Sequence, residues 1–486
     1  MTATQAATAP ARKRVPRSGR TNGSTPDLTP EARAAAGRAA RKRTPRSVHA
    51  DWSPAPDRKP VDLLMAQDAT RLPELVPLRW GRMLASPFTF YRGSAALMAA
   101  DICTAPSPGL AVQLCGDAHL SNFGGFASPD RDLVFDINDF DETLPGPFEW
   151  DVKRLGASVE IAGRDRKLSK RDRAAAVMAT VAGYREALQR LASMGQLDAW
   201  YLRLDERSLH AALDEQVAKK QIARMQKTAR KARSKDRMRA LERLTERVDG
   251  SLRIVNRPPL VVPVEDLLPP DQASLGSAFM QRVIAAYSKT LSGAARRLMD
   301  TYTYTHMARK VVGVGSVGTR AWIVLLTGRD DNDPLFLQVK EAQPSVLEPY
   351  AGRSRFPHHG RRVVEGQWMM QAASDIFLGW VRATGIDGVE RDFYVRQLWD
   401  WKASAEVETM DARMLATYGR MCGWTLAHGH ARSGDAAVIA GYLGNRDTFD
   451  RAIAAFSAGY ADQAERDFAE SNGAVTSGRI ETLRDV

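Results

Sequence analysis

The chain has 486 residues, 44% of them apolar and 26% charged, which fits two or three folded domains and excludes disorder throughout. Its three cysteines lie far apart and indicate neither a disulfide framework nor a cysteine-based zinc site, so we expect a reducing cytoplasm. No apolar run approaches the ~20 residues that span a bilayer, so no membrane is expected. The net charge of +12 invites a nucleic-acid interpretation.

That charge is concentrated in two segments. Residues 1–50 carry +9, residues 219–247 carry a further +9, and the rest of the chain carries −6. The first segment is rich in Ala, Thr, Ser, Pro and Gly, and predicts a disordered basic tail over residues 1–58. The second lacks Gly and Pro and predicts a long exposed helix. A nucleic-acid partner is therefore expected only through these two segments.

The rest of the chain predicts an α+β fold with two β-containing zones. Residues 59–304 are mainly helical in pattern, with a strand–loop–strand signal at 110–141. Strands return over 305–402, and residues 403–486 are helical again. We expect the last segment to pack on the first helical domain.

The loop Gly116–Asn122 contains the first group of candidate catalytic residues. Asp117, His119 and Asn122 lie between two short apolar runs, and Asp139 and Asp141 follow the next apolar run, LVFDI. This pattern suits phosphoryl transfer, in which one carboxylate orients a hydroxyl while amide and carboxylate oxygens hold Mg²⁺. The alternative is a polar turn whose acids accept hydrogen bonds from nearby backbone amides.

A glycine-rich loop forms the second group. Its residues Gly313, Gly315, Ser316 and Gly318 precede the β-rich run AWIVLL, a polar turn, and LFLQVK, which ends at Lys340. A dinucleotide-binding loop requires a helix at this point, and a Walker loop requires Lys after the last Gly, where Thr319 and Arg320 stand. The sequence favours a strand–loop–strand–turn–strand unit, which resembles the small lobe of a kinase, where such a loop covers the ATP phosphates; a hairpin with a solvated Lys remains the alternative.

These two groups resemble the protein-kinase-like superfamily, particularly its aminoglycoside-phosphotransferase branch. The resemblance implies that Asp117 is the catalytic base and that His119 supports the loop. Asn122, Asp139 and Asp141 would be the Mg²⁺ ligands. The glycine loop and Lys340 would hold ATP, with Glu365, 25 residues further on, as the partner of Lys340; Glu341 and Glu348 are rivals for that role.

Further expectations depend on the same resemblance. Asp151 would hold the backbone amides of the Asp117 loop, and Phe393–Lys402 would form a strand leading to a hinge that receives adenine. Because the glycine loop follows the Asp117 loop, the two-lobed kinase-like fold would be circularly permuted, with extra helices. Lys340 and Asp139 would then face one cleft within about 10 Å.

The segments SPFTFYRG, GDAHLSNFG, NDFDETLPGPFEWDVKRL, GVGSVGTR and LFLQVKEA resemble, more closely, an uncharacterised bacterial family named domain of unknown function 2252. The resemblance runs from about residue 60 to about residue 470 and implies no substrate.

We therefore expect an ATP- and Mg²⁺-dependent phosphotransferase acting on a hydroxyl of a small molecule. A nucleotide-binding or scaffolding protein without turnover is the first alternative, and a nucleic-acid-binding protein the second. The sequence does not predict an oligomeric state.

Overall fold

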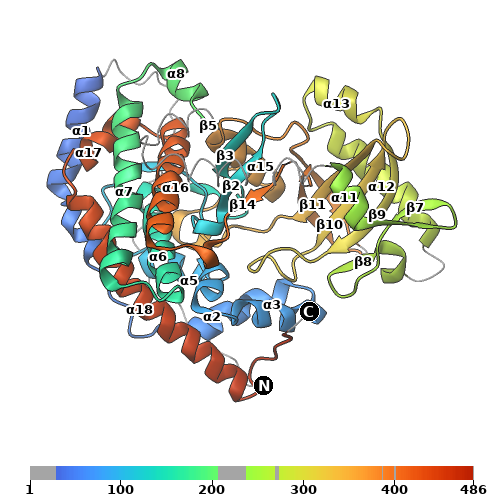
Figure 1. The fold of residues 1–486 in the computed structure, drawn as a ribbon, viewed down its shortest axis with the longest axis horizontal. Coiled ribbons are helices and arrows are strands. Elements are labelled where there is room, and N and C mark those ends of the chain that lie inside the picture. Colours follow the sequence, from blue (N-terminus) through green and yellow to red (C-terminus); the bar gives the residue numbers. More distant parts are fainter. Residues whose placement is uncertain (1–28, 206–236, 269–272, 386, 399–400, 485–486) are drawn as a thin grey trace, which may run out of the picture.

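The computed structural model describes residues 29–205, 237–268, 273–385, 387–398 and 401–484, and of residues 273–278 only the backbone. Helices and strands together confirm the predicted α+β class. Figure 1 shows two lobes, a helical lobe on the left and a sheet lobe on the right. Among the described residues, no helix combines the length and the apolar character needed to cross a membrane.

The helical lobe is built around α6, whose residues are buried over nearly its whole length. It packs against α7, α16 and α18, so the C-terminal helices α16 and α18 lie in this lobe. The bounds of the helices in this lobe are α1 Pro30–Arg43, α2 Pro60–Ala66, α3 Val76–Met83, α4 Pro87–Arg92, α5 Ala95–Ile102, α6 Phe148–Asp165, α7 Lys170–Ala192, α8 Gln196–Tyr201, α16 Ala412–Ser433, α17 Ala436–Leu443 and α18 Thr448–Thr476.

Two small antiparallel sheets in this lobe carry the Asp117 loop. The loop runs from β1 to β2, and β2 pairs with β3, which ends just before Asp139. The strands are β1 Ala111–Leu114 with β4 Leu144–Pro147, and, in spatial order, β14 Ala403–Ser404, β2 Phe123–Ala127, β3 Leu133–Ile137 and β5 Leu204–Asp205.

The sheet lobe contains one antiparallel sheet of six strands in the order β12-β13-β11-β10-β9-β8. Along β10, Val324 and Leu326 face one hydrophobic core, whereas Ile323 and Leu325 face another, as the two-residue period of a strand requires. The strands are β8 Val261–Pro263, β9 Thr303–Lys310, β10 Ala321–Thr327, β11 Pro334–Glu341, β12 Gly379–Thr384 and β13 Glu390–Gln397.

Helices cover both faces of that sheet. On one face, α12 Ala273–Ser288 and α13 Gly293–Met299 contribute Met280, Tyr287 and Met299 to the core. On the other face, α11 Arg237–Leu244 and the hairpin of β6 Thr245–Val248 and β7 Ser251–Ile254 cover the strands. The expected boundary at residues 304/305 is therefore wrong, because everything described from residue 237 to residue 304 packs with the sheet.

The N-terminal prediction is also wrong in part. Residues 1–28 lie outside the described residues, but α1 packs on α17 closely enough that a Cβ at Gly37 would meet the backbone of Val438. Arg41 donates to the carbonyl oxygen of Tyr442 at 2.7 Å, and Arg46 to that of Leu443, at the C-terminal end of α17. Cations stabilise such a helix end, so part of the basic charge serves the fold.

Residues 219–236, most of the second basic segment, lie outside the described residues. In its described part the helix is shorter than predicted, because α11 ends at Leu244 and the strand β6 begins at the next residue. The turn after β6 contains Asp249 and Gly250, both with positive φ, and an Asp-Gly pair is a strong hairpin signal.

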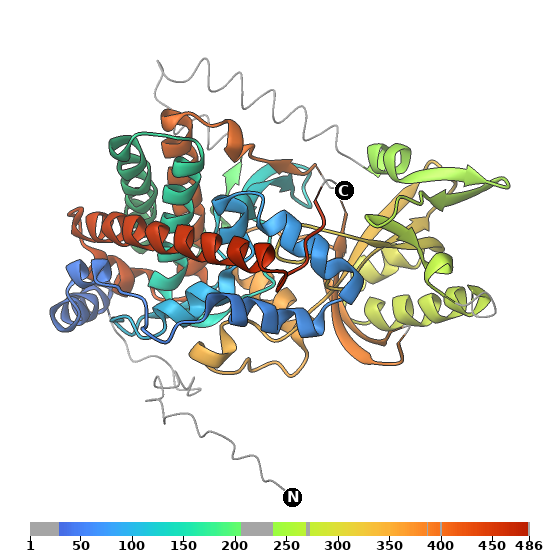
Figure 2. The same cartoon turned by 90° about the horizontal axis from the view of Figure 1, so that it is seen from below.

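Three further short segments join the lobes. Two are 3₁₀ turns, η2 Gln67–Thr70 and η3 Pro73–Leu75, next to α3, and the third is α15 His359–Met370, which lies between the sheet and α16. Figure 2 shows the segment from α2 to α5, in blue, reaching from the helical lobe to the sheet lobe. The glycine-rich loop therefore lies beside helices that come much earlier in the chain.

Candidate active site

The Asp117 loop is held from behind by α6. Asp151 is 1% exposed and accepts hydrogen bonds from the backbone N–H groups of Cys115 at 2.8 Å and Gly116 at 3.1 Å. This confirms the role predicted for Asp151. Its Oδ2 also lies 3.2 Å from His430 Nε2 on α16. The Asp151 carboxylate, which holds the Asp117 loop, is therefore positioned by residues of both α6 and α16.

Asp117 is paired with Arg154, which lies one turn along α6 from Asp151. Arg154 Nε donates to Asp117 Oδ1 at 2.9 Å, and Nη2, which donates to the carbonyl oxygen of Tyr91, lies 2.8 Å from the same carboxylate oxygen. Burial raises the pKa of Asp117 above its usual value, while the Arg154 charge acts in the opposite direction. The result is a fixed carboxylate with a second oxygen, Oδ2, outside the Arg154 contacts.

His119 lies next to that second oxygen, with Nε2 at 3.6 Å from Asp117 Oδ2. Burial lowers the pKa of His119 well below its usual value, and the charges of Arg92 and Arg154 act in the same direction, so its ring is neutral. Its Nδ1 is buried and has no hydrogen-bond partner among the described residues. His119 therefore borders the site as a neutral group.

Lys340 connects the sheet lobe to the two acids that follow β3. Its Nζ is 3.6 Å from Asp139 Oδ2 and forms a direct ion pair with Asp141 Oδ2. The expected proximity of Lys340 and Asp139 is confirmed. Tyr394 on β13 donates to Asp141 Oδ1 at 2.8 Å, and Ser316 Oγ donates to Asp141 Oδ2 at 3.3 Å.

The charges of this cluster stabilise each other. Burial alone would raise the pKa of Asp139, but Lys340 and Arg396 lower it to about 2. Burial alone would lower the pKa of Lys340, but Asp139 and Asp141 hold it well above the ordinary value. Asp139 is therefore a carboxylate and Lys340 an ammonium group throughout the neutral range.

Glu365 does not pair with Lys340, so this prediction is wrong. Glu365 Oε1 lies 3.1 Å from Nε of the exposed Arg361, one turn earlier on α15. The side chain of α15 that reaches the acids is Arg362, which donates to the carbonyl oxygens of Asp141 at 2.7 Å and Thr143 at 2.8 Å. The helix thus supplies a cation that holds the backbone of the Asp139–Asp141 segment.

The rival glutamates do not replace Glu365. Glu341 accepts hydrogen bonds from the backbone and side chain of Arg320, and Glu348 has no ion pair with Lys340 in the described residues. In this structure the partners of Lys340 are aspartates of the other lobe.

The glycine-rich loop joins β9 to β10, and its carbonyl oxygens are held by the α2–α5 segment. Leu72 N–H donates to the carbonyl oxygen of Gly318 at 2.8 Å, and Arg82 Nη1 donates to that of Gly313 at 3.0 Å. Arg71 donates to the carbonyl oxygen of Val317, whose side chain is fully buried. Within the loop, the N–H groups of Val317 and Thr319 bond to the carbonyl oxygens of Val314 and Ser316. The N–H groups of residues 313–316 have no hydrogen-bond partner among the described residues and could therefore bind a ligand.

Two glycines of the loop have a backbone that requires this residue. Gly313 has φ +65° and Gly318 has φ +89°, in the left-handed region that other residues rarely adopt. Val317 packs between them and the α3 region, against Leu75 and Leu78. The glycine-rich loop is thus held in place by a small hydrophobic core formed by Val317, Leu75 and Leu78.

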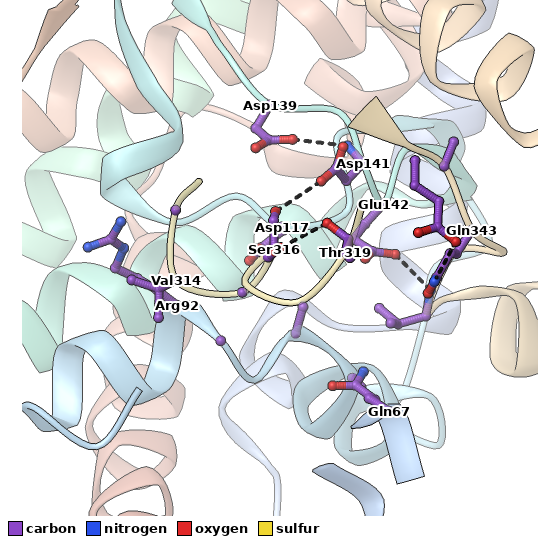
Figure 3. A pocket seen from close by; sticks show the side chains of 18 of the residues that line it. Gln67, Arg92, Asp117, Asp139, Asp141, Glu142, Val314, Ser316, Thr319 and Gln343 are labelled. Carbon is purple, nitrogen blue, oxygen red and sulfur yellow. Dashed lines mark hydrogen bonds between the residues drawn. The ribbon is translucent and has the colours of Figure 1, made fainter. Parts of the chain in front are cut away.

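A cavity of about 380 Å³ lies under this loop (Figure 3) and brings the predicted catalytic and metal-binding residues together. Asp117, His119, Asn122, Asp139 and Asp141 line it, as do Gly313, Gly315 and Ser316. Its remaining lining residues are Gln67, Thr70, Arg71, Arg92, Gly93, Ala95, Ala96, Glu142, Val314, Thr319, Glu341, Ala342, Gln343, Pro344 and Val346.

The predicted Mg²⁺ ligands offer oxygen atoms, the donors that this cation prefers. Asn122 Nδ2 donates to the carbonyl oxygen of Asp117 at 2.8 Å, which fixes the side-chain amide. In the described part of the chain, no group of three or more His, Cys, Asp or Glu side chains is arranged to hold a metal. These oxygen donors fit Mg²⁺, and a bound cation would share Asp139 and Asp141 with Lys340.

Residues 71–473 match the protein family described as "Uncharacterized protein conserved in bacteria (DUF2252)". The chain belongs to this family. The DUF2252 match includes the Asp117 loop, the glycine-rich loop, Lys340 and Arg71, whereas α1 lies before it. No curated protein and no solved structure matches the chain.

Several residues of the site in this DUF2252 protein were not predicted. Arg154 had a usable signal, because it lies three positions after Asp151 and therefore on the same face of a helix. No such sequence signal marked the other three residues, which contact the Asn138–Asp141 segment only because the fold brings α15 and β13 beside it. They are Arg362, Tyr394 and Arg396.

Proposed function

We propose that the protein is an ATP- and Mg²⁺-dependent phosphotransferase that transfers the γ-phosphoryl group to a hydroxyl of a small molecule. The observation that carries this proposal is the contact of Lys340 with Asp139 and Asp141, two acids that line the cavity under the glycine-rich loop. A loop of backbone N–H groups, a lysine and oxygen ligands for Mg²⁺ are the parts that hold a triphosphate for transfer. A kinase-like fold with permuted lobes belongs to the same proposal.

The order of elements in the sheet lobe supports it. The glycine-rich loop lies between β9 and β10, Lys340 is the penultimate residue of β11, the third strand counted from β9, and α15 follows. This is the order in which protein kinases place the loop, the lysine and the helix after it.

Asp117 is suited to receive the proton of the acceptor hydroxyl. Arg154 holds Oδ1 and leaves Oδ2 for the hydroxyl, and burial, by raising the pKa, keeps the carboxylate more basic than an exposed aspartate. In the transfer, a bond forms between the acceptor oxygen and the γ-phosphorus, and the bond from that phosphorus to the β,γ-bridging oxygen breaks. ADP leaves with that electron pair, and the proton passes to Asp117.

Asn122, Asp139 and Asp141 would hold Mg²⁺, which supplies charge neutralisation for the phosphates. Lys340 and the loop N–H groups orient the triphosphate, and the anchored position of Val317 keeps the loop in place over it. These residues fix geometry before the reaction, which is the main protein contribution to phosphoryl transfer.

Purified protein incubated with Mg·ATP tests the proposal through the release of ADP, with a panel of hydroxyl compounds as acceptors. Binding is measured separately by thermal shift. Nucleotide-dependent stabilisation together with ADP release supports the proposal, and the absence of both contradicts it.

A second candidate is a nucleotide-binding protein of the same family without turnover. One observation favours it: Lys340 forms an ion pair with Asp141, one of the acids that would hold the metal. Glu365 pairs with Arg361 and so does not compete for Lys340. Stabilisation by Mg·ATP without ADP release, with every acceptor in the panel, would support this candidate.

A further inference from the structure

The cavity extends from the acids towards the α2–α5 segment and away from β13. Its lining residues come from the glycine-rich loop, the Asp117 and Asp139 loops, the stretch after β11, η2, and the start of α5. None of them belongs to β13 or to the described residues between β13 and β14. The described residues of the hinge that the sequence suggested as the adenine site, 393–398 and 401–402, therefore do not border the cavity.

Large side chains fill the β13 side of Lys340. Tyr394 is 1% exposed and is hydrogen-bonded to Asp141. Arg396 Nε donates to Gln338 Oε1 at 3.0 Å, and its Nη1 donates to the carbonyl oxygen of Asn138 at 2.8 Å. A base placed between β13 and the Asp139 loop would have to break these contacts and displace a guanidinium group from its partners.

The opposite end of the cavity has the composition of a base-binding site. Alanine and other small apolar side chains form its walls, and a few polar groups lie at its edge, as in most small-molecule sites. The apolar residues are Ala95, Ala96, Ala342, Pro344 and Val346, and the polar ones are Gln67, Thr70 and Gln343. Two charged residues of the same segments, Arg71 and Glu341, also line the cavity, and Glu341 is paired with Arg320 and accepts a hydrogen bond from Gln343 Nε2 at 3.2 Å. In Figure 3, Gln67 and Gln343 lie at a distance from Asp139, with the loop residues Ser316 and Thr319 between them.

The polar groups at this end are held in place. Arg79 Nη2 donates to Gln67 Oε1 at 2.9 Å, which leaves the Gln67 amide nitrogen without a hydrogen bond to the described residues. Thr70 Oγ1 lies 3.1 Å from Gln343 Oε1, which connects η2 to the stretch after β11. A fixed amide donor beside apolar walls matches the polar edge and apolar faces of a purine.

We propose that the nucleotide binds with its triphosphate under the loop at Gly313–Ser316 and its base between η2, α5 and residues 342–346, on the side opposite β13. This inference rests on the proposed function, since it requires a nucleotide in the cavity. It assigns base recognition to Gln67, Thr70 and Gln343, and it leaves β13 with a role in holding the acids.

Photo-crosslinking with Mg·8-azido-ATP tests the position of the base directly. The protein is irradiated with the probe and digested, and the labelled peptide is identified by mass spectrometry. Label within residues 61–100 or 341–347, reduced by excess ATP, supports the inference. Label within residues 390–405 overturns it and leaves the proposed function standing.

A pair of variants on α5 provides a second test. Ala95→Leu narrows the apolar end of the cavity, whereas Ala100→Leu, on the same helix but outside the lining, is its control. We expect Ala95→Leu to weaken Mg·ATP binding about ten-fold or more while binding of inorganic tripolyphosphate is unchanged. Ala100→Leu should bind both ligands as the wild type does.

The outcomes separate this inference from the proposed function. Equal losses of ATP and tripolyphosphate affinity in Ala95→Leu, or no loss of either, overturn the position of the base. A wild-type protein that binds neither ligand overturns the proposed function and, with it, this inference. The melting temperature without ligand, unchanged in both variants, shows that any loss arises in the cavity.

Discussion

Lys340 and Asp139 lie 3.6 Å apart, Nζ to Oδ2, although one lies near the end of a strand of the sheet lobe and the other follows a strand of the helical lobe. Asp141 joins the same ammonium group by a direct ion pair. These contacts make the two lobes one site, and they hold charges of both signs where a triphosphate and its cation need them.

Replacing Asp117 tests the proposed base. Asp117→Asn keeps the shape of the side chain but removes the proton acceptor, so we expect turnover to fall about 100-fold or more with nearly unchanged Mg·ATP affinity. Initial rates of ADP release and a thermal-shift titration measure the two effects. Full activity in this variant would remove Asp117 from the mechanism.

Lys340→Met should affect both stability and nucleotide affinity. The substitution leaves two carboxylates without their cation, and because Asp139 and Asp141 are 30% and 27% exposed in their side chains, we expect a loss of only about 2 kcal/mol in the free energy of unfolding. Urea unfolding measures it. Glu365→Gln, whose partner is the exposed Arg361, is the matched control and should change neither property.

The contact between Arg82 and the glycine-rich loop predicts a smaller effect. Arg82→Ala removes one hydrogen bond to the carbonyl oxygen of Gly313, so the loop is less well fixed and Mg·ATP affinity should fall about 3- to 10-fold. Turnover at saturating ATP should stay near that of the wild type. A large drop in turnover at saturation, without a change in affinity, would show that Arg82 does not act through the loop.

Asp136 predicts how stability depends on pH. Burial raises its pKa from 3.8 to about 7, partly offset by the N–H groups of Ile137 and Ala372 and by Arg432. Between these two values the unfolded chain loses its proton first, so this carboxyl makes folding less favourable as pH rises from about 4 to 7.

Asp136→Asn removes that ionisation. We expect the melting temperature of the variant, relative to the wild type, to be about 3 °C higher at pH 8 than at pH 4.5. Calorimetry at the two pH values measures the difference. An offset that is the same at both would show that Asp136 does not titrate as its burial implies.

Sequence patterns predicted the local features of the site better than its long-range pairs. The Asp117 loop and the glycine loop depend on residues close to a strand, where spacing carries the information. The support from Asp151 was implied by the resemblance to the kinase-like superfamily. The prediction for Glu365 was wrong because α15 directs Arg362, and not Glu365, towards the acids. The rotation of a helix about its axis, which decides this, cannot be read from a local sequence pattern.

The extent of the sheet lobe could not be predicted either. Its β8 strand is only three residues long, and the α11–β7 segment joins the sheet by packing rather than by a strong periodic signal. The anchoring of the glycine loop by Arg71, Leu72 and Arg82 depends on contacts between segments far apart in sequence. Such contacts need the fold, because sequence spacing does not record them.

The most direct test compares wild type and Asp139→Ala in Mg·ATP turnover. The wild type should release ADP, and the variant should retain its fold by circular dichroism and lose at least about 100-fold in rate, because Asp139 is the carboxylate assigned to both the cation and Lys340. Equal ADP release by a folded Asp139→Ala variant would contradict the account.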